Sequence, residues 1–514
     1  MAVAAGEGKC PWTISRRFKS WSIVSSILSL FFRLKGKIVA NPEMLNVFLN
    51  PKSVAVIGAT ERPGSWGSFI MQGLLSGPFP GRIYPVNPQA EQIFGVPAFR
   101  NVKEIPDAPE LAVFTFPEPA VEQTIRECGE KGVKGISIIT AGFGEAVEHG
   151  KQREKELVRL ARSFGMRLLG PNVSGTFNLH AKFNASAAPV GYLIKSPIAG
   201  ICQGSYAIYD LLAHGYSKRM GLGLFVQTGN EADLTTTDFL EYVGADPHVQ
   251  GVMMYIEGVK DGRRFADVVR KVARTKPVIV YKAGKTPDAG RAAQSHTGAL
   301  AGSYLIYKGV FEQSNIIDCP TMELLLPLSH ALVELPAMRG KRVAIVTMGG
   351  SWGVALSDAL EDEGLSVPIL SPRLQSRLRE LGMPVRASVR NPVDIGASGL
   401  FLSVDVLTAL GREILTSGEV DALILHGMSR PGMLAEGEAN EFRFLLEVNK
   451  EIIRGYVDME KTFGIPVLIG SVYSPEESQM VHDLNQEGIR TLDRLDETAQ
   501  ILSRLARYWD RRGA

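Results

Sequence analysis

The sequence predicts an α/β protein built from three doubly wound units, each a parallel sheet with helices on both faces. Short, β-branched apolar runs alternate with longer amphipathic stretches, and this alternation starts again twice along the chain. Strands of such a sheet are buried on both faces, so they are apolar throughout. The length of 514 residues agrees with three units, because a domain takes roughly 100–200 residues.

The first unit is expected at residues 44–190. Its first strand, 53–58, has the sequence SVAVIG, a β-branched run that ends in glycine. A helical stretch follows to about residue 75. The later strands are expected at 82–86, 111–116, 135–140 and 167–170, with a helix at 118–131 among those between them.

The second and third units, expected at 191–336 and 337–514, repeat the pattern around a linker near Pro336. The second unit has expected strands at 198–202, 223–227, 251–256 and 277–282. The third has expected strands at 342–347, 422–426 and 466–470.

Composition narrows the class of protein. The net charge is +2, so no basic field favours nucleic acid as a partner. Apolar residues make up 45% and charged residues 21%, as in a globular protein with a large core. The four cysteines, Cys10, Cys128, Cys202 and Cys319, form no CxxC pair, which argues against a zinc site and a disulfide scaffold. We expect a cytoplasmic protein with no metal ligands of its own.

Residues 1–43 are expected to be an extension before the folded part, which starts near Met44. An apolar run at 23–32 lies between basic residues, but it is too short to span a bilayer. Three interpretations stay open: an unstructured extension, a basic amphipathic anchor on a membrane surface, or a start codon assigned too far upstream.

A glycine loop, 58–67 (GATERPGSWG), joins the first strand to the first helix. Backbone N–H groups and the positive end of a helix dipole suit a phosphate there. The spacing differs from the dinucleotide fingerprint, and the end of the second strand holds Asn87 where an NAD site needs an acid. Asn87 is compatible with a nucleotide that carries a ribose phosphate, such as CoA.

His296 lies in a run of small residues, 294–302 (QSHTGALAG), that would let a phosphate approach closely. Lys285 and Arg291 lie just upstream and could screen its charge. A histidine nucleophile is oriented through its second nitrogen, commonly by a carboxylate. Glu257 ends a core strand and is the candidate; Asp233 is the alternative, with helix capping as its structural interpretation.

Several motifs, in one order, resemble ADP-forming acyl-CoA (acetyl-CoA) synthetases, relatives of succinyl-CoA synthetase. The motifs are 50–59 (NPKSVAVIGA), 84–88 (YPVNP), 141–145 (AGFGE), 169–172 (LGPN), 229–233 (GNEAD), 255–261 (YIEGVKD), 295–302 (SHTGALAG), 347–354 (TMGGSWGV) and 391–394 (NPVD). The resemblance covers about Met44 to the carboxyl terminus. It implies a Rossmann-like CoA-binding domain followed by two flavodoxin-like domains.

The resemblance also implies site residues. His296 would accept a phosphoryl group and Glu257 would orient it. CoA would be bound by Gly58, Thr60, Gly64, Ser65, Gly67, Asn87, Pro117 and Asn172. Phosphate would be bound by Gly229, Asn230, Gly349, Gly350 and Ser351. The helix after Gly229 and Asn230 and the helix after Gly349, Gly350 and Ser351 would point their amino ends at the phosphate.

The resemblance further implies an alpha subunit that interconverts acyl-CoA, phosphate and ADP with a carboxylic acid, CoA and ATP. No ATP-grasp domain is evident in the sequence, so a separate ATP-grasp beta subunit would bring ATP or ADP and Mg²⁺. The partners expected are that subunit, a small carboxylic acid or its acyl-CoA, and phosphate. Two alternatives are a CoA-sensing regulatory protein of the same fold and, less favoured by Asn87, an NAD-dependent oxidoreductase.

Overall fold

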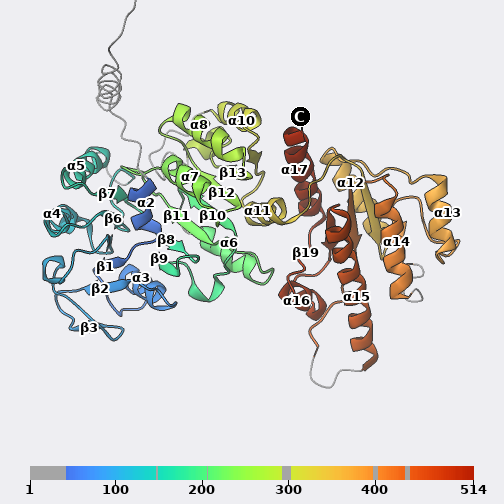
Figure 1. Ribbon diagram of the computed structural model, residues 1–514, viewed down its shortest axis with the longest axis horizontal. Coiled ribbons are helices and arrows are strands. Elements are labelled where there is room, and N and C mark those ends of the chain that lie inside the picture. The colour runs from blue at the N-terminus through green and yellow to red at the C-terminus, as the bar shows by residue number, and fades with distance from the viewer. Residues whose placement is uncertain are drawn as a thin grey trace, which may run out of the picture. The chain divides into compact units, whose positions relative to one another are not determined.

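The computed structural model describes residues 42–145, 149–204, 207–291, 303–396, 403–434 and 440–513. It confirms the α/β class, with three larger sheets of five, seven and five strands in the described chain (Figure 1). Residues 1–41 of the extension, with the run at 23–32, lie outside the described residues, as does His296. None of the described helices is long and apolar enough to cross a membrane.

The first sheet has the order β2-β1-β5-β6-β7, and all its strand pairs are parallel. Its strands are β1 (Ser53–Ile57), β2 (Arg82–Val86), β5 (Leu111–Phe114), β6 (Gly135–Ile138) and β7 (Arg167–Leu169). Its helices are α3 (Trp66–Leu75), α4 (Val121–Lys131) and α5 (Gly150–Ser163). A small hairpin, β3 (Gln92–Ile93) with β4 (Val96–Pro97), stands apart.

The second sheet has the order β14-β13-β12-β10-β11-β8-β9. Its parallel strands are β10 (Ile198–Cys202), β11 (Leu224–Gln227), β12 (Gly251–Ile256), β13 (Val278–Lys282) and β14 (Ile317–Asp318). Its helices are α6 (Ala207–Tyr216), α7 (Thr236–Ala245), α8 (Gly262–Ala273), α10 (Tyr304–Gln313) and α11 (Leu325–Glu334). Strands β8 (Gly175–Asn178) and β9 (Phe183–Ser186) extend it in antiparallel fashion, although they precede residue 190.

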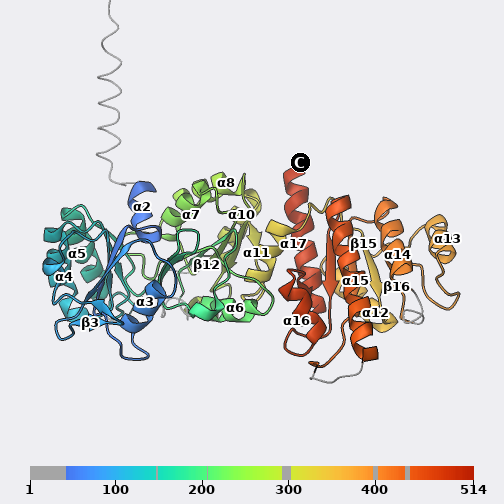
Figure 2. The ribbon, with the colours of Figure 1, turned by 60° about the horizontal axis from the view of Figure 1, so that its bottom comes forward.

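The third sheet has the order β16-β15-β17-β18-β19 and is parallel. Its strands are β15 (Val343–Thr347), β16 (Val393–Asp394), β17 (Ala422–His426), β18 (Val467–Gly470) and β19 (Thr491–Leu492). Its helices are α12 (Gly350–Asp362), α13 (Pro372–Glu380), α14 (Val404–Thr416), α15 (Asn440–Phe463), α16 (Gln479–Gln486) and α17 (Leu495–Gly513). Helices α12 and α17 pack together over one face (Figure 2).

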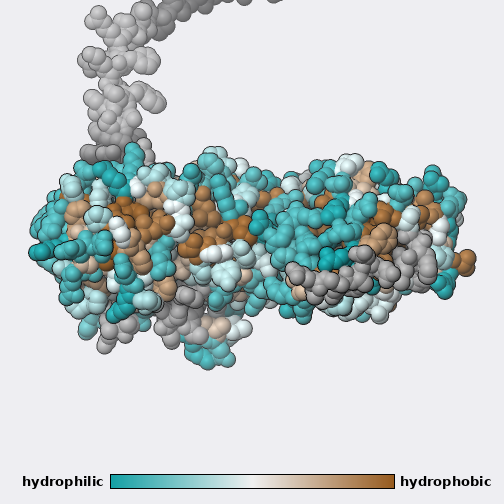
Figure 3. Space-filling view, turned by 90° about the horizontal axis from the view of Figure 1, so that it is seen from below, coloured by the Kyte–Doolittle hydropathy of each residue, from teal (hydrophilic) through white to brown (hydrophobic). Residues whose placement is uncertain are grey.

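The second and third sheets share one hydrophobic cluster. It joins Leu325 of α11 to Ile345 of β15 and Leu502 of α17, all of them buried. The first sheet has a cluster of its own, and helix α2 (Pro42–Leu49) links it to the second sheet through Phe48, whose ring meets that of Phe239 at 6.4 Å. Elsewhere apolar side chains reach the surface among polar ones, as on the face drawn in Figure 3.

Each sheet repeats one strand order. When the parallel strands are counted along the chain, each sheet reads 2-1-3-4-5, the flavodoxin-like order. In such sheets the first and third strands are neighbours, and ligands bind beyond their carboxyl ends, where the chain leaves in opposite directions. The three switch points lie between β1 and β5, β10 and β12, and β15 and β17. These positions locate the candidate sites.

Candidate functional site

The glycine loop lies at the first switch point, after β1. Gly58 has φ +91 and its amide donates to the Val86 carbonyl at 3.0 Å, which ties the loop to β2. The loop ends at Ser65, the N-cap of α3, whose hydroxyl accepts from the Ser68 amide. The loop therefore leads straight into a helix amino end, as an anion-binding turn does.

Gly67, in the first turn of α3, lets the helix approach the loop. A Cβ at this position would lie 2.2 Å from the Gly58 carbonyl oxygen, a distance no side chain tolerates. The carboxylate of Glu61 accepts from the Phe94 amide at 2.5 Å, so this acid is engaged with the hairpin region. These features fit the pyrophosphate of a nucleotide such as CoA, held by backbone N–H groups.

The remaining predicted CoA residues lie around this loop or farther along the same edge of the first sheet. Asn87 donates to the Ala59 carbonyl at 2.8 Å and accepts from the Gln89 amide at 2.9 Å, so it braces the loop. Thr60 accepts from the Arg62 amide at 3.2 Å, and Gly64 has φ +75. Pro117 follows β5, the other side of the switch point.

Asn172 follows β7, at the far end of the first sheet, where it meets the second unit. Its side-chain amide donates to Asn230 at 3.4 Å, and the Asn230 amide donates to the Pro171 carbonyl at 3.0 Å. A Cβ on Gly229 would lie 2.5 Å from the Asn172 carbonyl oxygen. The structure thus brings a predicted CoA residue and two predicted phosphate residues together.

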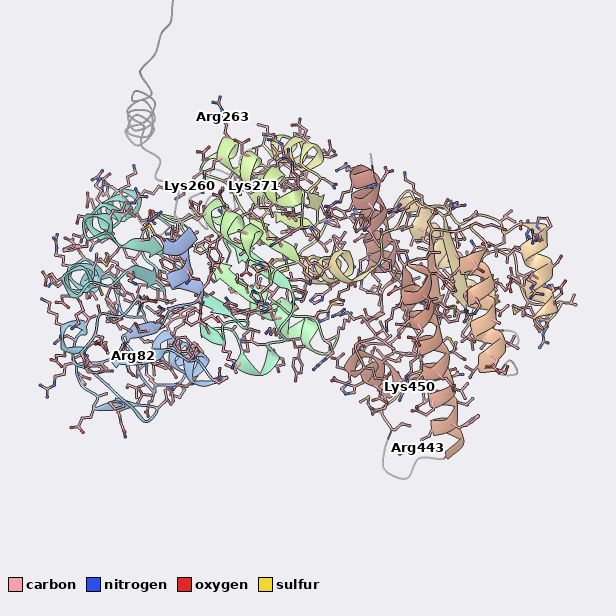
Figure 4. All side chains as sticks on the ribbon, viewed as in Figure 1. Arg82, Lys260, Arg263, Lys271, Arg443 and Lys450 are labelled. Atoms are coloured by element: carbon pink, nitrogen blue, oxygen red, sulfur yellow. The ribbon has the colours of Figure 1, made fainter. Side chains whose placement is uncertain are left out.

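Asn230 itself is held by acids and lies beside a lysine. Its side chain donates to Glu154 at 2.7 Å and to Glu145. Lys260, labelled in Figure 4, donates to the backbone carbonyls of Asn230, at 2.9 Å, and Glu231. Burial lowers the pKa of the Lys260 ammonium, against the attraction of nearby carboxylates. The 229–231 loop is therefore held rigidly between the two units.

The structure corrects two expectations for this loop. Helix α7 begins only at Thr236, where Thr235 forms the cap, and the Thr236 amide donates to Glu231 at 2.8 Å. A carboxylate thus already occupies the helix amino end that was expected to face a phosphate. Asp233 does not cap α7: it accepts from Arg167 at 2.7 Å, from the Leu168 amide at 3.0 Å and from Arg162.

Glu257 lies at the second switch point, directly after β12, and is 2% exposed. Its backbone amide donates to the Gln203 side chain at 2.6 Å, and Gln203 follows β10, the neighbouring strand. Its carboxylate accepts from the Tyr255 hydroxyl at 3.3 Å. Lys282, which ends β13 on the other side, donates to the Glu257 carbonyl at 2.8 Å. The carboxylate is thus fixed at the point where the fold places ligands.

The basic side chains on and after β13 are buried or already paired. Burial lowers the pKa of Lys282 to about 8, although Glu257 opposes the change. Lys285 donates to the carbonyls of Cys319, at 3.0 Å, and Pro320, at 3.3 Å. Arg291 pairs with Asp288. The basic residues expected to screen a phosphate therefore have other partners in this structure.

Gly349, Gly350 and Ser351 lie at the third switch point. Gly349 is the N-cap of α12, and its amide donates to the Thr347 hydroxyl at 3.2 Å. Asp394 stands on the β16 side, since a Cβ on Gly350 would lie 2.9 Å from its Oδ2. These three residues belong to a sheet separate from that of Glu257.

The sequence motifs did not mark Gln203, Lys260 and His426 as site residues. His426 ends β17 across the third switch point, and it follows an apolar run as Glu257 does. That signal, a polar residue closing a core strand, could have identified it. Gln203 and Lys260 act through backbone contacts that only the folded chain creates.

Comparison with known proteins identifies the family. Residues 52–177 match the family described as a CoA binding domain, and residues 195–332 match that described as a succinyl-CoA ligase like flavodoxin domain. The alpha subunit of ADP-forming acetate–CoA ligase II of Pyrococcus furiosus is 42% identical over 355 residues, 69% of this chain and 77% of the relative. The alpha subunit of ligase I from that organism is 36% identical over 475 residues, 90% of this chain and 97% of the relative.

A solved structure supports the same family assignment. It is described as dinucleotide forming acetyl-coenzyme A synthetase 1 of Candidatus Korarchaeum cryptofilum in complex with phosphate and ADP. It is 33% identical, with a TM-score of 0.78, and covers 92% of this chain and 98% of that chain. The resemblance inferred from the motifs is confirmed. This chain belongs to the alpha subunits of the ADP-forming acyl-CoA synthetases, which are acid–thiol ligases.

Proposed function

We propose that this chain performs the CoA and phosphoryl-carrier steps of the ligase, with His296 as the carrier. Phosphate attacks the acyl-CoA thioester and releases CoA, which leaves an acyl phosphate. A nitrogen of His296 then takes the phosphoryl group, and the carboxylate leaves as the free acid. The phosphohistidine finally passes the group to ADP, which yields ATP.

The observation that carries the proposal is the position of Glu257. It carries a buried carboxylate at a switch point, where its backbone amide donates to the Gln203 side chain and its carboxylate accepts from the Tyr255 hydroxyl. Its strand pairs in parallel with β13, so both strands end at one edge of the sheet, and the chain runs on from β13 toward His296. A carboxylate there can orient the second ring nitrogen of a histidine nucleophile.

CoA is proposed to bind at the first switch point, with its pyrophosphate on the loop from Gly58 to Gly67. This family takes CoA and a nucleotide, and the loop supplies a helix amino end without a neighbouring free acid. Asn172 and Asn230 lie where the first and second units meet, and the thioester end of CoA is proposed to reach this point. The substrate is proposed to be a small carboxylic acid.

The nucleotide and Mg²⁺ are proposed to belong to an ATP-grasp partner. Relatives are described as alpha subunits, which implies a second subunit. Helix α10 offers that partner two exposed apolar side chains, Leu305 and Ile306. The domain limits 44–190, 191–336 and 337–514 remain proposals. A cytoplasmic location is also proposed, and the free buried thiols are compatible with it.

The test is phosphorylation of the chain by ³²P-labelled acetyl phosphate. Wild type should gain acid-labile, alkali-stable label, and His296→Ala should gain none while calorimetry shows that it still binds CoA. His248→Ala, which removes an exposed histidine paired with Asp246, is the matched control and should label like wild type. Equal labelling of His296→Ala and wild type would refute the assignment.

A further inference from the structure

His426 ends β17 in the third sheet. In the second sheet the corresponding strand is β12, which ends just before Glu257. Strand β17 is the third strand of its unit and the neighbour of β15. The loop from β15 into α12 begins on the other side of this switch point, and the Met348 amide donates to the His426 carbonyl at 3.0 Å. The imidazole therefore lies where this strand order places a ligand.

The ring of His426 is buried and has no polar partner within the described part of the chain. The residue is 1% exposed, and neither ring nitrogen has a hydrogen bond to any described residue. Burial lowers the pKa of the imidazole to about 4, so the ring is neutral at neutral pH and carries one N–H donor. A buried donor without an acceptor is costly and calls for an explanation.

His330 shows what a structural histidine looks like in this chain. It is also 1% exposed, and burial lowers its pKa to about 3. Its Nε2 lies 3.1 Å from the Gly221 amide and its Nδ1 lies 2.9 Å from a Glu334 carboxylate oxygen. Burial alone therefore does not leave a histidine unpaired in this fold, and His426 differs by its place at the switch point.

The surroundings of His426 suit an anion. Its ring lies 5.5 Å from that of Trp352, in the first turn of α12, so it faces the amino end of a helix of 13 residues. One acid, Asp394 of β16, borders the same helix end, since a Cβ on Gly350 would lie 2.9 Å from its Oδ2. It lies on the β16 side of β15, whereas His426 lies on the β17 side. Trp352 is 42% exposed, so this end of α12 is open to solvent.

We propose that the ring N–H of His426 donates a hydrogen bond to a phosphoryl group that docks at the amino end of α12. The inference deepens the proposed function and rests on it in one respect, namely that the group arrives as phosphohistidine on His296. Free inorganic phosphate has the same chemistry and is the alternative source. His426 binds the group in this scheme and receives no covalent bond.

The test observes the histidine nitrogens of the complete chain by NMR after ¹⁵N-histidine labelling, with His426→Gln to assign the signal. In wild type, acetyl phosphate should shift the His426 nitrogens and leave those of His330 unchanged. In His296→Ala, which cannot carry the group, inorganic phosphate alone is added. A shift in either arm supports the docking site, and the arm in which it appears identifies the source. No shift in either arm overturns the proposal.

A variant pair separates binding from folding. His426→Leu removes the unpaired donor, so it should melt at the same temperature as wild type or higher, while its affinity for the shifting ligand falls about 10-fold or more. His426→Gln keeps an N–H donor and should stay within about threefold of wild type. A lower melting temperature with unchanged affinity would mean a structural histidine and would refute the inference. If His296 takes no label, the proposed function fails, whereas the inorganic phosphate arm still decides on His426.

Discussion

At the scale of single residues, Glu257 differs from most other acids of the chain by its position. It lies at the carboxyl end of a core strand, where this fold places ligands. The sequence could predict Glu257 because it interrupts an apolar run at a strand end. The sequence could not predict which carboxylates have partners. Asp233 and Glu257 look alike as candidates, yet Asp233 is bound by two arginines and Glu257 is held by Gln203 and Tyr255.

We expect Glu257→Gln to slow phosphorylation of the chain by roughly 10–100-fold, because a neutral amide orients an imidazole less well and does not stabilise its positive charge. Single-turnover labelling with acetyl phosphate measures the rate constant. Glu460→Gln is the control, since Glu460 is a partly buried carboxylate of the third unit that accepts from the Val467 amide. A rate constant that stays at the wild-type value in Glu257→Gln would assign the orienting role to another group.

At the scale of elements, apolar runs predicted the central strands and missed the short ones at the edges. Strands β14, β16 and β19 have two residues each, too few for any periodicity. Strands β8 and β9 contain asparagine, serine and threonine and bury them through hydrogen bonds that no sequence pattern reveals. The helix start at Thr236 was misjudged because Gly229 resembles a helix-entry turn, whereas Thr235 forms the capping box.

Asp233 ties the loop before α7 to the first unit. Removal of the Asp233 carboxylate should therefore destabilise the fold. Burial raises the pKa of the Asp233 carboxyl, but hydrogen bonds from Arg167, Leu168 and Arg162 and the Arg167 charge hold it below its ordinary value. Its side chain is 0% exposed and that of Arg167 is 6% exposed. We expect Asp233→Asn to cost about 3 kcal/mol at neutral pH, because Arg167 is left buried without a counter-charge.

The ion pair of Asp233 with Arg167 also makes the free energy of unfolding depend on pH. Because the folded pKa is depressed, the stabilisation is complete above the unfolded value, about 4, and is lost as the pH falls through the folded value. The difference between wild type and Asp233→Asn in urea unfolding should therefore shrink below about pH 4. Asp421→Asn, whose partner Arg342 is half exposed, should cost about 1 kcal/mol or less. Equal losses in both variants would contradict the argument.

At the scale of the whole molecule, one strand order occurs three times. Each unit has the 2-1-3-4-5 order, and each places its polar residues at a switch point: the Gly58 loop, Glu257, and the Gly349 loop with His426. The repeated alternation in the sequence was enough to predict this architecture. The contact of Asn172 with Asn230 could not be predicted, because it depends on how two units pack.

The proposals use the first switch point for CoA, Glu257 at the second for the carrier histidine and the third for docking of the phosphoryl group, but they assign ADP no site in the described chain. A phosphohistidine with no nucleotide to reach cannot complete the cycle. We therefore expect the purified chain to form no ATP from acetyl-CoA, phosphate and ADP, although acetyl phosphate labels it. Addition of an ATP-grasp beta subunit should restore ATP formation, and His296→Ala should abolish it again in the mixture. Coupled ATP detection with and without the partner measures this, and sustained turnover by the chain alone would place the nucleotide site within it.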